Sequence, residues 1–203
     1  MIRWAPFLRA GLCFIALLSA AKPALAQVIP PGTYTGQING DTINAAVVYV
    51  DAGAFFASST LSLTGSAGVY WRQVGSLNGM TITQGNGTYI YLSGASRGLT
   101  LNGATSLTGT VSVYSDGSAG TAITNQGTIT HTGGNGEIYA ANFTNAGTVT
   151  ANGGTLYLNY PSAGYSATNT GTVTADGAST TVYLRGNFDN NGTLTAQNSG
   201  TLL

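Results

Sequence analysis

The sequence contains one cysteine, Cys13, and one lysine, Lys22, and both lie within the first 26 residues. Since no cysteine follows, neither a disulfide nor a thiolate metal site can form in the rest of the chain. That part carries three arginines against six carboxylates, a net charge of −3. Because binding to phosphate depends on clustered Lys and Arg, we expect no nucleic-acid partner. We also expect no metal and no cofactor.

Long apolar runs are equally scarce. Arg3 and Arg9 flank one short run at 12–18, and small residues follow it up to Ala26. This layout predicts a secretory signal peptide over residues 1–26. The run is far shorter than the roughly 20 residues that cross a bilayer. We therefore expect no transmembrane helix in the mature chain, which would be exported through the inner membrane to the cell surface or beyond.

The mature chain also lacks any clear helical pattern. It is rich in Gly, Thr, Asn and Ala. Thr, Val, Ile and Tyr favour strands, whereas Asn and Gly favour turns. The composition predicts an all-β protein of many short strands.

What the chain does contain is a repeated phrase, Asn-x-Gly-Thr. Its Asn stands at 125, 145, 169 and 190, in steps of 20, 24 and 21 residues. Looser versions, with the Gly directly after the Asn, begin at Asn39, Asn78 and Asn102. Such self-similarity is typical of a solenoid.

A second phrase, an apolar-Tyr-apolar triplet, repeats at a similar period. Its centres are Tyr49, Tyr70, Tyr91, Tyr139, Tyr157 and Tyr183, and Val111-Ser112-Val113 takes the same place with Ser at its centre. The centres at 49, 70, 91 and 112 are 21 residues apart each time. Two phrases at one period indicate about eight units of 20–24 residues each.

This pattern predicts a right-handed parallel β-helix over residues 39–203, with residues 27–38 as an N-terminal lead-in or cap. Alternation along 171–174 would send Val173 inward and Thr172 and Thr174 outward. We expect two strand phrases per coil, with Asn and Gly at the positive-φ turn positions between them. Asn side chains at one turn could also form a ladder. The rival is an antiparallel sandwich, but a sandwich has no reason to repeat one strand sequence.

The segments TNQGTIT, TNAGTVT, TNTGTVT and DNNGTLT resemble the repeats of right-handed β-helical passengers of bacterial autotransporters and filamentous-haemagglutinin-type adhesins. The resemblance is clear over 123–203 and looser over 39–122. It implies export from a Gram-negative bacterium and an adhesive or structural role at the cell surface. The resemblance says little about activity, because the repeated residues form the turns and the core.

The chain stops inside a coil, at 200–203. Solenoids need capping units to stay soluble, and an open strand edge invites pairing with another chain. We therefore expect the repeat domain to be incomplete at its C-terminus, and end-to-end self-association through the uncapped coil.

The titratable residues do not form an evident catalytic set. The acids stand singly, and the best pair for glycoside chemistry would be Asp176 and Asp189, one on each side of a coil. His131, the only histidine, has no neighbouring acid to orient it, so we interpret it as a solvated turn residue. We expect no enzyme. The alternative is a polysaccharide-active β-helix enzyme.

Two repetitive surfaces remain as candidates for binding. The first is a single outward column of Tyr49, Tyr70, Tyr91, Tyr139, Tyr157 and Tyr183, which could contact a host-cell or matrix glycan or protein. The second is an outward Thr-x-Thr face made of Thr128, Thr130, Thr148, Thr150, Thr172, Thr174, Thr193 and Thr195, with Thr81 and Thr83 further up the chain. Such a hydroxyl-and-methyl array is similar to the faces of some β-helical ice-binding proteins. The sequence thus predicts a structural or adhesive protein first, with ice binding as a third reading.

Overall fold

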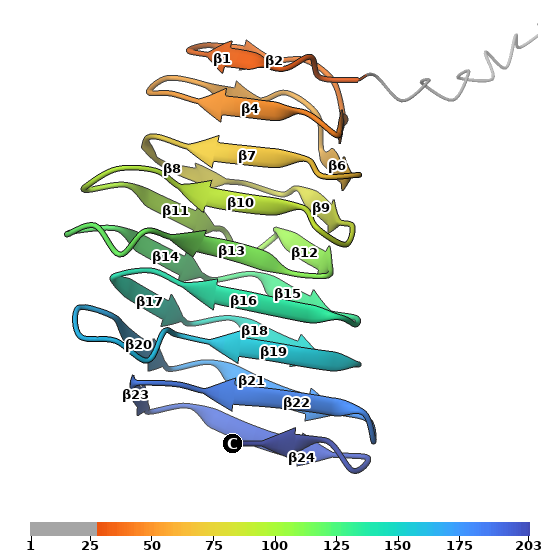
Figure 1. Cartoon of the computed structure of the whole chain (residues 1–203), viewed down its shortest axis with the longest axis vertical. Coiled ribbons are helices and arrows are strands. Elements are labelled where there is room, and N and C mark those ends of the chain that lie inside the picture. The colour runs from red at the N-terminus through yellow and green to blue at the C-terminus, as the bar shows by residue number, and fades with distance from the viewer. Residues whose placement is uncertain (1–27) are drawn as a thin grey trace, which may run out of the picture.

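The computed structural model describes residues 28–203, so the predicted signal peptide lies outside the described residues. These residues form only strands, turns and loops. Figure 1 shows them wound into a right-handed parallel β-solenoid whose coils stack along one axis. All paired strands of residues 28–203 run parallel, and the sheets hold eight full coils. No helix in the described part could cross a membrane.

Each coil passes through three sheets in turn. The first, here called the tyrosine sheet, contains β1 (Gly32–Tyr34), β4 (Val47–Val50), β7 (Gly68–Trp71), β10 (Tyr89–Leu92), β13 (Ser112–Ser115), β16 (Asn135–Tyr139), β19 (Gly154–Leu158), β22 (Thr180–Leu184) and β25 (Thr201–Leu202). The chain next enters a sheet that carries neither repetitive surface, and we call it the third sheet although it comes second along each coil. It contains β8 (Val74–Leu77), β11 (Gly98–Leu101), β14 (Ala122–Asn125), β17 (Asn142–Asn145), β20 (Ser166–Asn169) and β23 (Asn187–Asn190).

The last sheet of each coil is the threonine sheet. It contains β3 (Thr42–Asn44), β6 (Thr60–Thr64), β9 (Thr81–Gln84), β12 (Ser106–Gly109), β15 (Thr128–His131), β18 (Thr148–Ala151), β21 (Thr172–Asp176) and β24 (Thr193–Gln197). A separate pair, β2 (Gln37–Ile38) and β5 (Phe55–Phe56), occupies the place of the third sheet in the first two coils. The predicted parallel β-helix is confirmed.

The number of strands per coil differs from the expectation of two. The residues just before the repeated Asn, such as Asn142–Asn145, form a strand of their own in the third sheet. The expectation of two strand phrases per coil left these residues between strands, where Asn was expected at a turn position. Pairing with the coil above and below makes them extended, so a coil has three strands.

The repeated aliphatic residue of the Asn-x-Gly-Thr phrase lies in the core as predicted. Ile129 pairs with Val149, Val149 with Val173, and Val173 with Leu194. The first three are fully buried and Leu194 packs against the core from a partly buried position. Burial of one such side chain stabilises the fold by about 1.5–3 kcal/mol, so the stack is a repeated source of stability along the rod.

The repeated Asn residues form the expected ladder from coil to coil. The amide of Asn125 donates to Oδ1 of Asn145, Asn145 donates to Asn169, and Asn169 to Asn190, each at 2.7 Å. The amide of Asn145 also donates to the carbonyl of Thr172 at 3.1 Å. The first three asparagines are buried. The ladder therefore pairs polar groups that would otherwise be buried without partners.

The repeated Gly has a different role from the one predicted. Gly127, Gly147, Gly171 and Gly192 do not have a positive φ. Instead, a Cβ on Gly147 would overlap the carbonyl oxygen of Gly127, one on Gly171 that of Gly147, and one on Gly192 that of Gly171. The expectation of a positive-φ turn at these four positions is wrong. Glycine is needed there because the backbones of successive coils come into direct contact.

Candidate functional site

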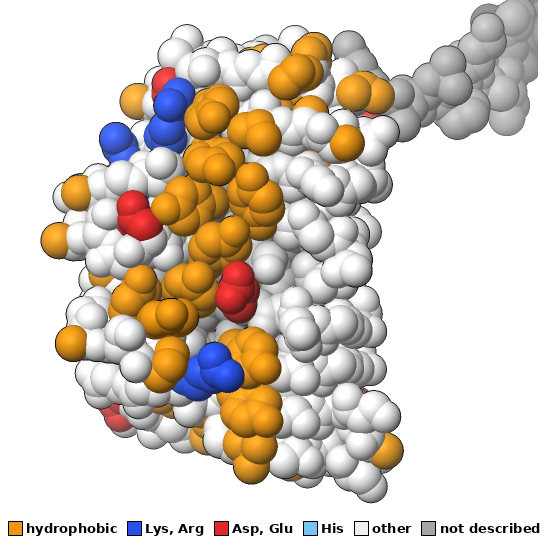
Figure 2. Space-filling model, viewed as in Figure 1, with side chains coloured by type: hydrophobic (Ala, Val, Ile, Leu, Met, Phe, Trp, Pro, Cys, Tyr) orange, Lys and Arg blue, Asp and Glu red, His pale blue; other side chains and the backbone are white. Residues whose placement is uncertain are grey.

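Tyrosines form a continuous surface along the outer face of the tyrosine sheet. Tyr49 pairs in register with Tyr70, Tyr70 with Tyr91, Tyr91 with Tyr114, and Tyr114 with Tyr139. All five are partly exposed. Figure 2 shows the resulting band of apolar side chains running along the length of this face.

The composition of this column differs from the predicted one in two ways. Tyr114, not Ser112, stands between Tyr91 and Tyr139, because the chain is two residues longer in that coil. Tyr157 pairs with Glu137 instead of Tyr139, so it lies one column further along the same face together with Tyr183. The six predicted tyrosines thus share one face but not one column.

Besides Tyr114, three further tyrosines that the triplet pattern did not select complete the surface. Tyr89 begins β10, and Tyr160 and Tyr165 lie in the loop between β19 and β20. We define the tyrosine strip as Tyr49, Tyr70, Tyr89, Tyr91, Tyr114, Tyr139, Tyr160 and Tyr165, whose neighbouring ring centroids are 5.0–6.1 Å apart. No repeat marks Tyr160 or Tyr165 in the sequence, since their loop occurs in one coil only.

Arginines lie against tyrosine rings near both ends of this face. The guanidinium of Arg72 is 4.5 Å from the ring centroid of Tyr49 and donates to the carboxylate of Asp51 at 2.6 and 2.9 Å. The guanidinium of Arg185 is 3.7 Å from the ring centroid of Tyr157. Both contacts are cation–π interactions, so these cations hold the aromatic rings in place.

Burial raises the pKa of five phenols of the strip, those of Tyr89, Tyr91, Tyr114, Tyr139 and Tyr165. It raises the pKa of Tyr89 to about 12. Burial also raises the pKa of the Glu137 carboxyl, which the positive charge of Arg185 opposes. The strip therefore offers neutral rings and hydroxyls over the physiological pH range.

A recess of about 240 Å³ opens beside the strip. Its lining includes Tyr89 and Tyr114 together with Glu137, Asn86 and Asn135. The recess thus places hydrogen-bonding amides and a carboxyl next to exposed ring surface. This is a combination of apolar contact and a few polar groups that ligand sites commonly use.

The threonine sheet carries the second repetitive surface. Register aligns the predicted pairs Thr128/Thr130, Thr148/Thr150, Thr172/Thr174 and Thr193/Thr195, and it continues them upward through Ser106/Thr108, Thr81/Thr83 and Thr60/Ser62. We call these fourteen residues the threonine lattice. Neighbouring side chains lie about 4.8 Å apart across strands and about 6.7 Å apart along them. The lattice is a flat, uncharged array of hydroxyl and methyl groups.

The two carboxylates considered for chemistry lie on different sheets. Asp176 ends β21 on the threonine sheet and accepts hydrogen bonds from Gln197 and Asn198, which hold its pKa below the usual value. Asp189 lies in β23 on the third sheet. Within residues 28–203, no three His, Cys, Asp or Glu side chains come together as a metal site would require.

His131 is buried, which corrects its interpretation as a solvated turn residue. It is fully inaccessible at the end of β15 and points into the core. Its Nδ1 accepts a hydrogen bond from the backbone N–H of Val111 at 3.3 Å. Burial lowers its pKa. Alternation along β15 explains the position, because His131 follows Ile129 by two residues.

No protein-family model matches the chain, and neither the curated proteins nor the solved structures yield a match. The fold and the two surfaces are therefore the observations from which a function can be argued.

We predict that His131 makes the fold less stable in mild acid. Its pKa is about 6.5 in an unfolded chain and lower in the folded one, so the unfolded state binds more protons below pH 6.5. Stability should therefore fall as the pH drops from 7.5 to 5.5, by at most about 1.4 kcal/mol per pH unit. Urea unfolding at both pH values measures the change.

The matched control is His131→Gln, because Gln84 already fills an equivalent inward position and bonds to the backbone of Ser112. This variant should lose less stability than the wild type over the same pH interval. The raised pKa of Glu137 changes stability in the opposite direction as the pH falls. Because Glu137 is present in both proteins, its contribution cancels in the comparison. Equal losses in the two proteins would contradict the prediction.

Proposed function

We propose that this chain is a non-catalytic, exported β-solenoid that acts at the bacterial surface as a structural and adhesive rod. The observation that carries the proposal is the unbroken contact of eight tyrosine rings across six coils of one outer face. Exposed apolar patches of this extent commonly mark interaction sites. Tyrosine also contributes a large contact area and a polar hydroxyl at a low cost in conformational entropy.

We assign the strip to a glycan chain of a host cell or matrix. A linear glycan is long enough to follow the strip along the rod, and its rings have apolar faces with hydroxyls at their edges. The tyrosine rings can contact those faces, while Glu137, Asn86 and Asn135 in the adjoining recess can bond the hydroxyls. The charge of Arg72, which lies over Tyr49, is paired with Asp51. Arg185 lies over Tyr157, outside the strip. The strip therefore suits an uncharged glycan.

The resemblance of the Asn-x-Gly-Thr repeats to autotransporter and haemagglutinin-type passengers supports export and a surface location. Asp176 and Asp189 lie on different sheets, and each accepts at least one hydrogen bond from a side-chain amide near it. This supports a non-catalytic role, because glycoside hydrolysis uses two carboxylates that flank one glycosidic bond. A polysaccharide-active enzyme remains the competing proposal, and it requires sugar-degrading activity that is lost on changing either Asp176 or Asp189.

Replacing Tyr91 and Tyr114 by Ser should abolish most attachment to immobilised glycans, with a loss of about tenfold or more, because central aromatic residues dominate binding surfaces. Glycan-array binding and attachment to cultured cells measure the effect. Tyr91→Phe with Tyr114→Phe should retain binding through the rings. Tyr183→Ser is the matched control, since Tyr183 lies on the same outer face but its ring contacts Tyr157, which is not part of the strip.

Far-UV circular dichroism should be unchanged in all these variants. Attachment that survives loss of both tyrosines would contradict the assignment of the strip. Attachment that depends on the strip but resists removal of glycans from the cells would identify a protein receptor instead.

The threonine lattice favours a second candidate function, binding to ice. Seven successive coils place two hydroxyl-bearing residues side by side on a flat parallel sheet. If the lattice binds ice, the protein should show thermal hysteresis that Thr150→Tyr abolishes. Thr144→Tyr, in the same coil but on the third sheet, should leave it intact. Absence of hysteresis in the wild type would eliminate this candidate.

A further inference from the structure

The ladder of hydrogen bonds around the solenoid is interrupted at one place. β5 pairs with β2 and β8 pairs with β11, but β5 and β8 do not pair with each other. The same two coils remain paired on the other two sheets, through β4 with β7 and β6 with β9. The gap is therefore a local opening in the wall of an otherwise continuous solenoid.

Both ends of this opening are closed by hydrogen bonds. At one end the side-chain amide of Gln73 accepts from the N–H of Gly53 at 3.2 Å and donates to the carbonyl of Ala54 at 2.9 Å. At the other end the N–H of Thr81 donates to the carbonyl of Ser59 at 2.8 Å. Between these points lies a cleft of about 300 Å³.

The two walls of the cleft are strand edges. The N–H groups of Phe55 and Ala57 donate to the carbonyls of Gly36 and Ile38 in the first coil, so the backbone of Phe56 between them faces the cleft. On the other wall, the carbonyl of Leu77 accepts from the N–H of Asn102 in the coil below. Because alternate residues of a strand direct their backbone groups to opposite sides, Ser76 presents its N–H and carbonyl to the cleft.

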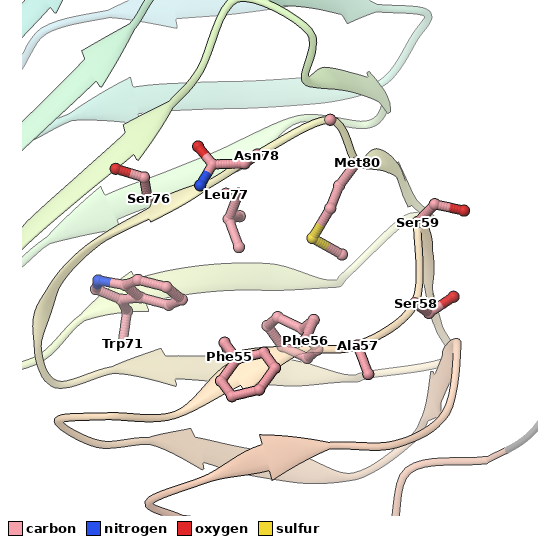
Figure 3. Close-up of a pocket in the computed structure, with 11 residues that line it drawn as sticks. Phe55, Phe56, Ala57, Ser58, Ser59, Trp71, Ser76, Leu77, Asn78 and Met80 are labelled. Atoms are coloured by element: carbon pink, nitrogen blue, oxygen red, sulfur yellow. The ribbon is translucent and has the colours of Figure 1, made fainter.

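The lining of the cleft is uncharged and combines large apolar side chains with polar groups. Figure 3 shows Phe55 and Phe56 on one wall, with Leu77 and Met80 on the other and Trp71 beside them. Phe55 is 55% exposed, although a large aromatic side chain is normally covered. The remaining lining residues are Ala, Ser, Asn and Gly, so no charged side chain borders the cleft.

We propose that this cleft takes up a short extended peptide, which inserts between β5 and β8 and completes the third sheet. Two facing strand edges match the N–H and C=O groups of a strand on both of its sides, which no simple apolar molecule can do. From the spacings of a sheet, about 300 Å³ holds about two residues of extended chain. The absence of charge selects an uncharged sequence, with one aliphatic side chain directed at Leu77 and Met80.

Intrinsic fluorescence gives a direct measurement. The sequence has two tryptophans, Trp4 and Trp71, so in the Trp4→Phe chain all tryptophan emission, excited selectively over that of tyrosine, comes from the cleft. The probe is a capped peptide with the sequence of residues 121–126, Thr-Ala-Ile-Thr-Asn-Gln, whose central part forms β14 in the third sheet. Its addition should shift the Trp71 emission saturably and reduce quenching by acrylamide.

Ser76→Pro should weaken this binding at least tenfold. Proline removes the N–H that faces the cleft but none of the bonds from β8 to β11, and edge strands tolerate it. Ser76→Ala keeps the N–H and should bind as the wild type does. The same peptide with Pro in place of its Ile should also fail to bind.

Three results would overturn the proposal. The first is the absence of a saturable change with the peptide. The second is equal binding by the Ser76→Pro and Ser76→Ala variants. The third is a saturable response to decanol without any response to the peptide, which would make the cleft a site for small apolar molecules. None of these outcomes bears on glycan binding by the tyrosine strip, which lies on another sheet.

Discussion

Direct contact between successive backbones at the Asn-x-Gly-Thr phrase is the constraint on which the rest of the structure depends. The glycines at 127, 147, 171 and 192 touch through their main chains, and no side chain fits between them. The asparagines two residues earlier in each coil pair through their amides and satisfy the buried polar groups at the same corner. One phrase therefore sets both the spacing of the coils and their register.

Because the register between coils is fixed, a repeat in the sequence produces repetitive surfaces on the solenoid. Since side chains alternate with a period of two, residues at one position of each coil form a straight row on one face. The threonine lattice is the simplest result, because each coil contributes the same two positions. The tyrosine strip arises in the same way but crosses a change in register at Glu137 and Tyr157, where loop tyrosines 160 and 165 extend the contact.

Periodicity was sufficient to predict the parallel solenoid, the aliphatic stack, the Asn ladder and the alignment of the threonines, because each follows from a regular step along the chain. It was not sufficient where coils differ in length. Tyr114 was missed because its coil places the ring two residues beyond the expected triplet. The opening between β5 and β8 was missed because no repeated sequence pattern marks it. The burial of His131 could have been predicted from alternation with Ile129, but its polarity suggested an exposed turn.

The free energy of unfolding of Asn145→Ala, measured in urea beside Asn152→Ala, tests most directly whether the repeated phrase acts through contact between coils. Asn145 lies in the middle of the buried ladder, whereas Asn152 is exposed. Removal of the Asn145 amide takes one of two acceptors from the amide of Asn125, and it takes a donor from the buried side-chain oxygen of Asn169 and from the carbonyl of Thr172. The account therefore predicts a loss of about 3 kcal/mol. The exposed substitution should change stability by less than about 0.5 kcal/mol. Equal, small losses in both variants would show that the repeated Asn is only a turn residue, and would contradict the account.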